Sequence, residues 1–298
     1  MHASLPLPVE ILGNILRRID DYQTLYLVAL VCRRFYPEAS MILYRSPKNL
    51  SPYRHITFLS SLASDPRLAC LVRSYKLPPI AGKQRITCLE LLRITLPMMI
   101  NLKELSIMAT ANEMQILPMP RLTFQVENLS WIQIDSTKND QFMRWAQSQK
   151  SMKHLRWIHR EAVEISRSAF PDLVSLEGNL HVVEALMPGR SIRRLHWIAD
   201  AFYDGEFNVR NKLAVEMGNL QSLTFEDGFN TIKYSMIACH LHSLTFLELV
   251  GDFHKSVRFL STSIFMPNAV LIYVKGHGDD SITTHLEDLG ILSGPNDR

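Results

Sequence analysis

The sequence has few glycines and cysteines, and it has no long uninterrupted apolar run. Glycine occurs only 12 times in 298 residues, which argues against an enzyme built around a glycine-rich phosphate loop. The four cysteines form no C-x-x-C pair, so we expect reduced thiols and a cytoplasmic and/or nuclear protein. No run of eighteen uncharged apolar residues occurs, and the N-terminus lacks the basic region of a secretory signal. We therefore expect no contact with a membrane.

An excess of charge of one sign is also missing. Lys plus Arg number 32 and Asp plus Glu 29, and a net charge of +3 is too small to indicate binding of nucleic acid. Hydrophobic residues make up 47% of the chain and charged residues 20%, which excludes disorder over most of its length. The spacing of the apolar residues is therefore the informative feature.

The first 45 residues predict three short helices. Pro8 stands at a first helical position, and Ile11, Leu12 and Ile15 then fall on one stripe of a helix. Residues 25–31 are apolar on every side, so we expect the second helix to be buried from several directions. A third helix should end near residue 45. A unit of this size is marginal alone, so it must share its core with the rest of the chain or with a partner.

The order of these residues resembles the F-box, a three-helix adaptor motif. The resemblance rests on Leu-Pro-Val-Glu-Ile-Leu at 7–12, Leu-Val-Cys-Arg at 30–33 and Leu-Tyr-Arg at 43–45, with Phe35 where members often have Trp. It implies docking onto the Skp-type linker protein of a cullin-RING ubiquitin ligase. The apolar residues expected to bind this linker are Leu7, Pro8, Ile11, Leu12, Ile15, Leu30, Val31 and Cys32. The alternative is three core helices at the edge of a larger helical domain.

A short pattern recurs beyond residue 60: apolar, two residues, apolar, one residue, apolar. Successive copies lie 19 to 30 residues apart, close to the period of about 20 to 29 residues in leucine-rich repeats. No copy carries the Asn or Cys that regular members have after the strand, so the array is irregular. The middle apolar residues are Tyr75, Leu105, Ile132, Leu155, Leu176, Leu195, Leu223, Leu247 and Leu271.

The segments between the copies have helical spacing. The clearest are 86–96, 140–149, 181–187, 233–241 and 252–264. We predict an α/β fold: an N-terminal three-helix F-box, then an irregular leucine-rich-repeat solenoid with parallel strands inside and helices outside. The predicted domains are residues 1–48 for the F-box, 55–292 for about nine repeats, and 293–298 for a frayed tail. A helical-repeat solenoid is the alternative, and the L-x-x-L-x-L pattern argues against it.

The sequence contains no catalytic motif at the required spacing. G-x-S-x-G, H-E-x-x-H and G-x-G-x-x-G are all missing, so we expect no enzyme and no cofactor. Cys239, His240, His242 and His254 are the densest group of Cys and His, but they lack the spacing of zinc ligands. No metal site is therefore predicted.

The residues between the apolar positions are the candidate substrate surface. They point out of the parallel sheet, on the face that repeat proteins use for binding. His154, Arg156, Arg194 and His196 would give a basic centre, with acidic flanks at Glu104, Asp135, Glu226 and Glu248. Trp131 and Phe246 would be aromatic anchors. This pattern would suit an acidic or phosphorylated segment, and a solvated face of unselected charges is the alternative.

The sequence therefore predicts a substrate-recognition adaptor of a Skp/cullin/F-box ubiquitin ligase. The partners would be the linker protein, through it a cullin, and a protein substrate, with no nucleic acid and no membrane. A leucine-rich-repeat scaffold that does not lead to ubiquitylation is the main alternative. A hydrolase or transferase would need a converging polar cleft, for which the sequence gives no sign.

Overall fold

The computed structural model describes residues 8–31, 33–48, 50–133, 140–159, 164–198, 211–227, 240–251 and 271–275. The chain divides into two compact units, residues 1–149 and residues 150–298. The predicted helix at 252–264, most of the one at 233–241 and the tail lie outside the described residues. The domain boundary predicted between residues 48 and 55 rests on sequence motifs alone, and it stays a prediction.

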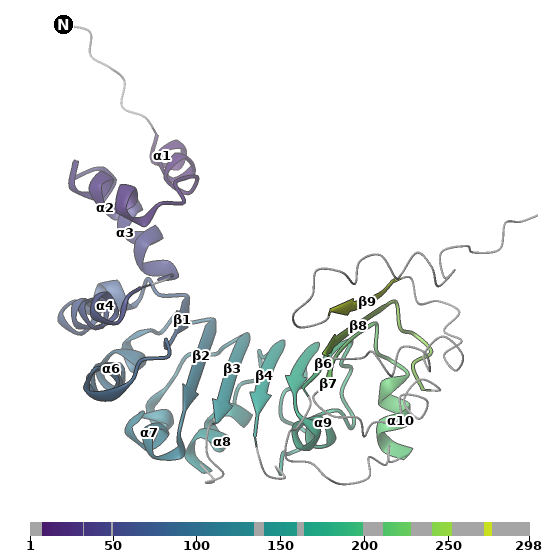
Figure 1. The fold of residues 1–298 in the computed structure, drawn as a ribbon. Coiled ribbons are helices and arrows are strands. Elements are labelled where there is room, and N and C mark those ends of the chain that lie inside the picture. Colours follow the sequence, from purple (N-terminus) through teal and green to yellow (C-terminus); the bar gives the residue numbers. More distant parts are fainter. Residues whose placement is uncertain are drawn as a thin grey trace, which may run out of the picture. The chain divides into compact units, whose positions relative to one another are not determined.

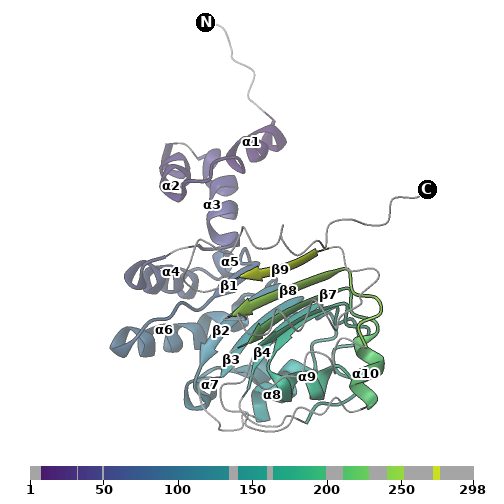
Figure 2. The ribbon, with the colours of Figure 1, turned by 45° about the vertical axis from the view of Figure 1, so that its right-hand side comes forward.

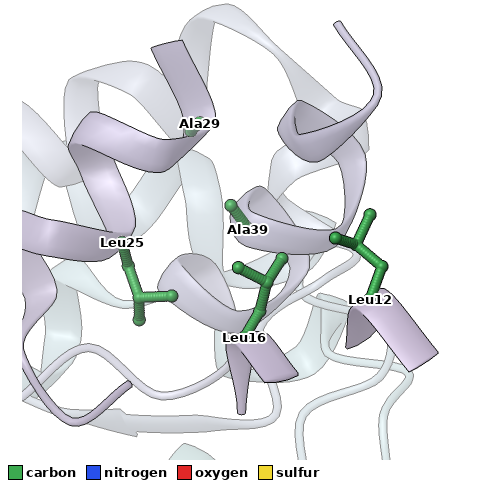
Figure 3. Packing of buried hydrophobic residues seen from close by; sticks show 5 residues of the cluster. All are labelled: Leu12, Leu16, Leu25, Ala29 and Ala39. Atoms are coloured by element: carbon green, nitrogen blue, oxygen red, sulfur yellow. The ribbon is translucent and has the colours of Figure 1, made fainter. Parts of the chain in front are cut away.

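The first unit begins with three helices, α1 (Val9–Leu16), α2 (Tyr22–Val31) and α3 (Phe35–Arg45), as the apolar spacing predicts. Asp21 caps α2, since its carboxylate accepts a hydrogen bond from the backbone N–H of Thr24 at 2.8 Å. Figure 3 shows the small core between the helices, which contains Leu12, Leu16, Leu25, Ala29 and Ala39. In α2 only Leu25 and Ala29 are buried, so the expectation that this helix is covered from several directions is wrong.

Helices α4 (Pro52–Ser64) and α5 (Pro66–Ala69) connect this core to the first strand, β1 (Ser74–Lys76). The backbone N–H of Arg73 donates to the carbonyl of Arg45 at the end of α3, at 2.8 Å. Tyr44 of α3 stacks on Phe58 of α4, with ring centroids 5.6 Å apart. The three helices are thus joined to the strand region by hydrogen bonds and aromatic contacts.

His55 of α4 is buried against β1. Its Nε2 shares a hydrogen bond of 2.8 Å with the hydroxyl of Tyr75, and burial lowers the pKa of His55 to about 4. Because the folded chain disfavours the protonated ring, the neutral form contributes stability above the unfolded pKa of about 6.5, and this is lost as the pH falls toward 4.

We expect the protein to lose about 2 kcal/mol of unfolding free energy between pH 8 and pH 5 through His55 alone. Urea unfolding at both pH values measures this loss, and the His55→Gln variant should lose about 2 kcal/mol less than the wild type over the same range. His242→Gln, at an exposed histidine, is the control and should keep the wild-type pH dependence. Equal losses in the wild type and His55→Gln would contradict the prediction.

The rest of the first unit alternates strands and helices. Strands β1, β2 and β3 pair in parallel, and Figures 1 and 2 show α6, α7 and α8 together on one side of them. A part-buried ion pair between Arg85 of α6 and Glu113 of α7 joins two of these helices, and Glu113 also completes a capping box with Thr110. The elements are α6 (Gly82–Thr95), η1 (Leu96–Met98), β2 (Glu104–Ala109), α7 (Ala111–Ile116), η2 (Met119–Arg121), β3 (Asn128–Gln133) and α8 (Asp140–Gln147).

The second unit continues the same alternation. Each of its strands pairs in parallel with the next one along the chain, from β4 to β9. The chain is therefore α/β, with a helical N-terminal region followed by parallel strands and helices. The elements are β4 (His154–Ile158), β5 (Ser175–Gly178), α9 (Leu180–Leu186), β6 (Arg194–Ile198), α10 (Asn211–Met217), β7 (Ser222–Asp227), β8 (Phe246–Gly251) and β9 (Leu271–Lys275).

The strand register tests the predicted middle residues of the repeated pattern. Seven of the nine pair with one another as expected: Tyr75 with Leu105, and then Leu155, Leu176, Leu195, Leu223 and Leu247 in succession. Two predictions are wrong, since Leu105 pairs with Leu129, not Ile132, and Leu247 pairs with Ile272, not Leu271.

The error at β3 has a simple origin. Val126, Leu129 and Trp131 also fit the repeated pattern, and the structure buries these three. Because side chains alternate along a strand, this choice moves Trp131 from the outer face to the core and Ile132 away from it.

The strands of both units also begin in the same way. The carbonyl of Arg73 accepts hydrogen bonds from the backbone N–H groups of Lys103 and Glu104, at 2.8 and 3.0 Å. The carbonyl of Lys153 accepts from Val174 and Ser175 in the same manner, at 2.9 and 3.0 Å. The carbonyls of Lys103, Val174, Arg193 and Gln221 repeat this arrangement. Strands β2, β3, β5, β6, β7 and β8 are thus anchored to the preceding strand at the same position, which keeps their middle residues in line.

Polar side chains support the turns of the second unit. The side-chain amide of Asn179, which follows β5, donates to the carbonyl of His159, which follows β4, at 2.6 Å. The buried guanidinium of Arg190 donates to four backbone carbonyls, those of Ser166, Ala169, Leu186 and Pro188. Desolvation by burial lowers the pKa of Arg190, and these carbonyls compensate for part of that cost.

Candidate functional site

The first candidate surface is an apolar face on α1 and α2, here called the helix face. It consists of six exposed residues at helical spacing: Ile11 and Ile15 on α1, and Tyr26, Leu27, Leu30 and Val31 on α2. Leu30 and Val31 are 63% and 71% exposed. Both helices pack on α3, and each exposes large apolar side chains, which is typical of a protein-binding surface.

The helix face contains four of the eight residues predicted to bind a linker protein: Ile11, Ile15, Leu30 and Val31. Pro8 is exposed at the N-cap of α1, whereas Leu7 and Cys32 lie outside the described residues. Leu12 must be corrected, because it is only 4% exposed and packs in the three-helix core. It supports the face from beneath.

Tyr26 and Leu27 are binding candidates that sequence reasoning did not assign. Both were placed in a helix expected to be covered all round, and the structure leaves them exposed. The sequence feature that points to these two residues is that α2 is apolar on every side. A helix of this kind needs cover, and here that cover is not supplied by the described residues of the same unit.

The second candidate surface is the outward side of strands β4 to β8, here called the strand face. Two rows of side chains cross it, as the register defines them. The first row is His154, Ser175, Arg194, Ser222 and Phe246, and the second is Arg156, Glu177, His196, Thr224 and Glu248. The four predicted basic residues and Phe246 therefore lie on one face of the same unit.

The basic centre needs a correction, because Glu177 lies within it. Its Oε1 is 3.0 Å from Nε of Arg156 and 3.4 Å from Nδ1 of His196. Glu177 is directly between these two residues in the register, so the carboxylate offsets part of the positive charge of Arg156. The sequence contains an acidic residue at this position, but only the strand order shows which side chains it contacts.

The acidic flanks are only partly placed. Glu248 accepts a hydrogen bond from the hydroxyl of Thr224 at 3.1 Å. Glu104, in the first unit, accepts one from the amide of Asn128 at 3.0 Å. Asp135 and the side chain of Glu226 lie outside the described residues.

Trp131 is not an anchor on an outer surface. Its side chain is 1% exposed and contacts Phe142 of α8. The prediction followed from placing Ile132 at the middle position, and the observed register turns Trp131 toward the core and Ile132 away from it. Phe246 is half-buried on the strand face and remains available as an anchor.

Among the described residues, no three or more His, Cys, Asp and Glu side chains are grouped so that they could hold a metal ion. Cys239 and His254, from the densest Cys and His group of the sequence, lie outside these residues. No helix in the described part of the chain has the length and apolar character needed to cross a membrane.

Comparison with known proteins identifies the helical region. Residues 5–82 match the family model described as the COS11 F-box domain. The chain therefore carries an F-box domain, and the match continues past α1, α2 and α3 through α4, α5 and β1. F-box domains in general bind Skp-type linker proteins, which indicates an adaptor role of the SCF type. No curated protein sequence matches the chain.

Proposed function

We propose that this protein is a substrate-recognition adaptor of a Skp/cullin/F-box ubiquitin ligase. The helix face would dock the linker protein and through it a cullin, and the strand face would bind a protein substrate. The observation that carries the proposal is the coincidence of the matched F-box domain with the exposed helix face, in which Leu30 and Val31 are 63% and 71% exposed. The chain itself would be neither an enzyme nor cofactor-dependent, and it would act in the cytoplasm and/or the nucleus.

We further propose that the strands and helices form an irregular leucine-rich-repeat solenoid. The middle residues support this, because from β1 to β3 and from β4 to β8 the buried middle residue of one strand pairs with that of the next. The carbonyl that accepts two N–H groups at the start of β2, β3, β5, β6, β7 and β8 supports it as well. In such an array each repeat buries its apolar side on its neighbours, which leaves the other strand face for a ligand.

A capture experiment with the proteasome inhibited tests the adaptor role. The intact chain should retain the Skp-type linker and a cullin, together with partners whose abundance rises when the proteasome is blocked. A Leu7→Ala/Pro8→Ala variant should lose the linker and the cullin, because both residues belong to the opening of the F-box.

Two outcomes would count against the adaptor role. Retention of the linker by the double variant at wild-type strength would contradict docking through this segment. Partners whose abundance is unaffected by proteasome inhibition would instead indicate an interaction scaffold that does not lead to ubiquitylation.

A further inference from the structure

Basic, hydroxyl and aromatic side chains follow one another along the first row of the strand face. It runs from His154 through Ser175, Arg194 and Ser222 to Phe246, one residue from each of five consecutive strands. We propose that this row binds an extended substrate segment in which an acidic side chain and an apolar side chain are three residues apart. The inference rests on the proposed function, because it takes the strand face as the substrate surface.

The acidic side chain is assigned to Arg194. This residue is exposed, and its registered neighbours on both sides are serines, Ser175 and Ser222. A guanidinium flanked by two hydroxyls offers several hydrogen-bond donors to one carboxylate, and the row contains no acidic residue that would compete. Glu177, in the second row, is already bound to Arg156 and His196. A carboxylate from a partner would therefore serve as the counter-ion of the Arg194 guanidinium.

The apolar side chain is assigned to Phe246. This aromatic residue is half-buried at the β8 end of the row, where part of its ring faces the outer side of the strands. Aromatic residues in such positions often contribute much of the energy of an interface. Glu248 is two residues further along the same strand and would repel a second acidic group at this end. The middle of the row, at Arg194, and its β8 end, at Phe246, therefore select different side chains.

The spacing follows from strand geometry. Arg194 and Phe246 are two strands apart, and neighbouring strands are about 4.8 Å apart, which places their backbones about 10 Å from each other. A ligand chain in the polyproline-II conformation advances about 3.1 Å per residue with three residues per turn, so side chains three residues apart lie on the same side of the chain and about 9 Å apart. The expected motif is acidic-x-x-apolar or its reverse order.

A set of labelled peptides tests the spacing against the full chain. Each peptide carries one Glu and one Leu in a Gly/Ser background, with the Leu one to five positions from the Glu and in both orders. Fluorescence polarisation should show the tightest binding at a spacing of three, at least fivefold tighter than at one or five. Equal binding at all spacings would overturn the proposal. Binding only when phosphoserine replaces Glu would overturn the assignment to a carboxylate.

Substitutions on the row test the two assignments separately. Arg194→Gln should weaken binding of the best peptide at least tenfold and remove its dependence on Glu, whereas Phe246→Ala should remove its dependence on Leu. Arg167→Gln, at an exposed arginine outside the strands of the same unit, is the matched control and should bind like the wild type. An equal loss in Arg167→Gln and Arg194→Gln would overturn the assignment to this row.

Capture of the linker protein separates this inference from the proposed function. If the full chain retains the linker and its proteasome-sensitive partners but Arg194→Gln captures the same partners, the row is not the substrate site and the adaptor role stands. If the linker is not retained while peptides still bind with the expected spacing, the adaptor role fails and the binding row stands.

Discussion

Replacing Leu30 and Val31 by aspartate should weaken binding of the Skp-type linker more than about 100-fold, beyond the range of a standard capture experiment. Both residues are on the exposed side of α2, at 63% and 71% exposure, so the charges are solvated in the free protein. In a complex they would be buried against an apolar partner without counter-ions, which costs several kcal/mol. Isothermal titration with purified linker protein measures the loss.

The design of this variant separates binding from folding. The three-helix core uses Leu25 and Ala29 of the same helix, and neither is altered, so the circular dichroism spectrum should remain that of the folded protein. The two aspartates lie in the last turn of α2 and oppose the helix dipole by about 0.3–1 kcal/mol each, so the melting temperature should fall by only a few degrees. Val215→Asp is the matched control, because Val215 of α10 is 72% exposed and lies in the second unit. Linker binding at wild-type strength by the Leu30/Val31 variant would disprove the assignment, and an equal loss in Val215→Asp would show that the effect is nonspecific.

Gly178→Val should destabilise the second unit by more than about 3 kcal/mol, at the upper end of the usual cost of overpacking. A Cβ at Gly178 would lie 2.8 Å from the carbonyl oxygen of Trp157 and 2.9 Å from Cγ1 of Val182. The register also places Gly178 between Trp157 and Trp197, both buried. A backbone oxygen on one side and two indoles in the adjacent positions leave little room for relaxation, because protein interiors are close-packed.

Urea unfolding followed by tryptophan fluorescence measures this effect, since two of the reporting tryptophans flank the site. Gly189→Ala is the control: its φ of +75° costs a side chain about 1 kcal/mol, and a Cβ there meets nothing within 4 Å. If Gly178→Val does not express, Gly178→Ala should still lose more stability than Gly189→Ala. Equal losses for the two alanine variants would show that Gly178 is not needed for packing.

The apolar periodicity was sufficient to predict the strands because each strand repeats one local rule. An apolar residue three before the middle position, one at it and one two after it all face the core, and this spacing is readable without knowledge of the partner strands. Leu105, Leu155, Leu195 and Leu223 were found in this way, and the structure pairs each with its expected neighbour. The same rule failed at β3, where two overlapping registers fit the sequence.

The binding surfaces were only partly predictable, for a related reason. Ile11, Ile15, Leu30 and Val31 are exposed, but the sequence could not distinguish Ile11 and Ile15 from Leu12, which belongs to the same apolar stripe of α1 and is buried. On the strand face it identified Arg156 and His196 without the carboxylate that joins them, since Glu177 is 21 residues from one and 19 from the other. Contacts of this kind arise between strands, not along them.

The sequence by itself determined the helical N-terminal region, the F-box resemblance and the recurring strands, because all three follow from short-range spacing of apolar residues. Only the tertiary structure decided which apolar residues are core and which are surface, and which charges are neighbours. One of the few glycines, Gly178, shows this in the tertiary structure: the two neighbouring strands place Trp157 and Trp197 at the positions paired with it. The physical reason is that a side chain's direction depends on the strand paired beside it, and that pairing joins residues far apart in the chain.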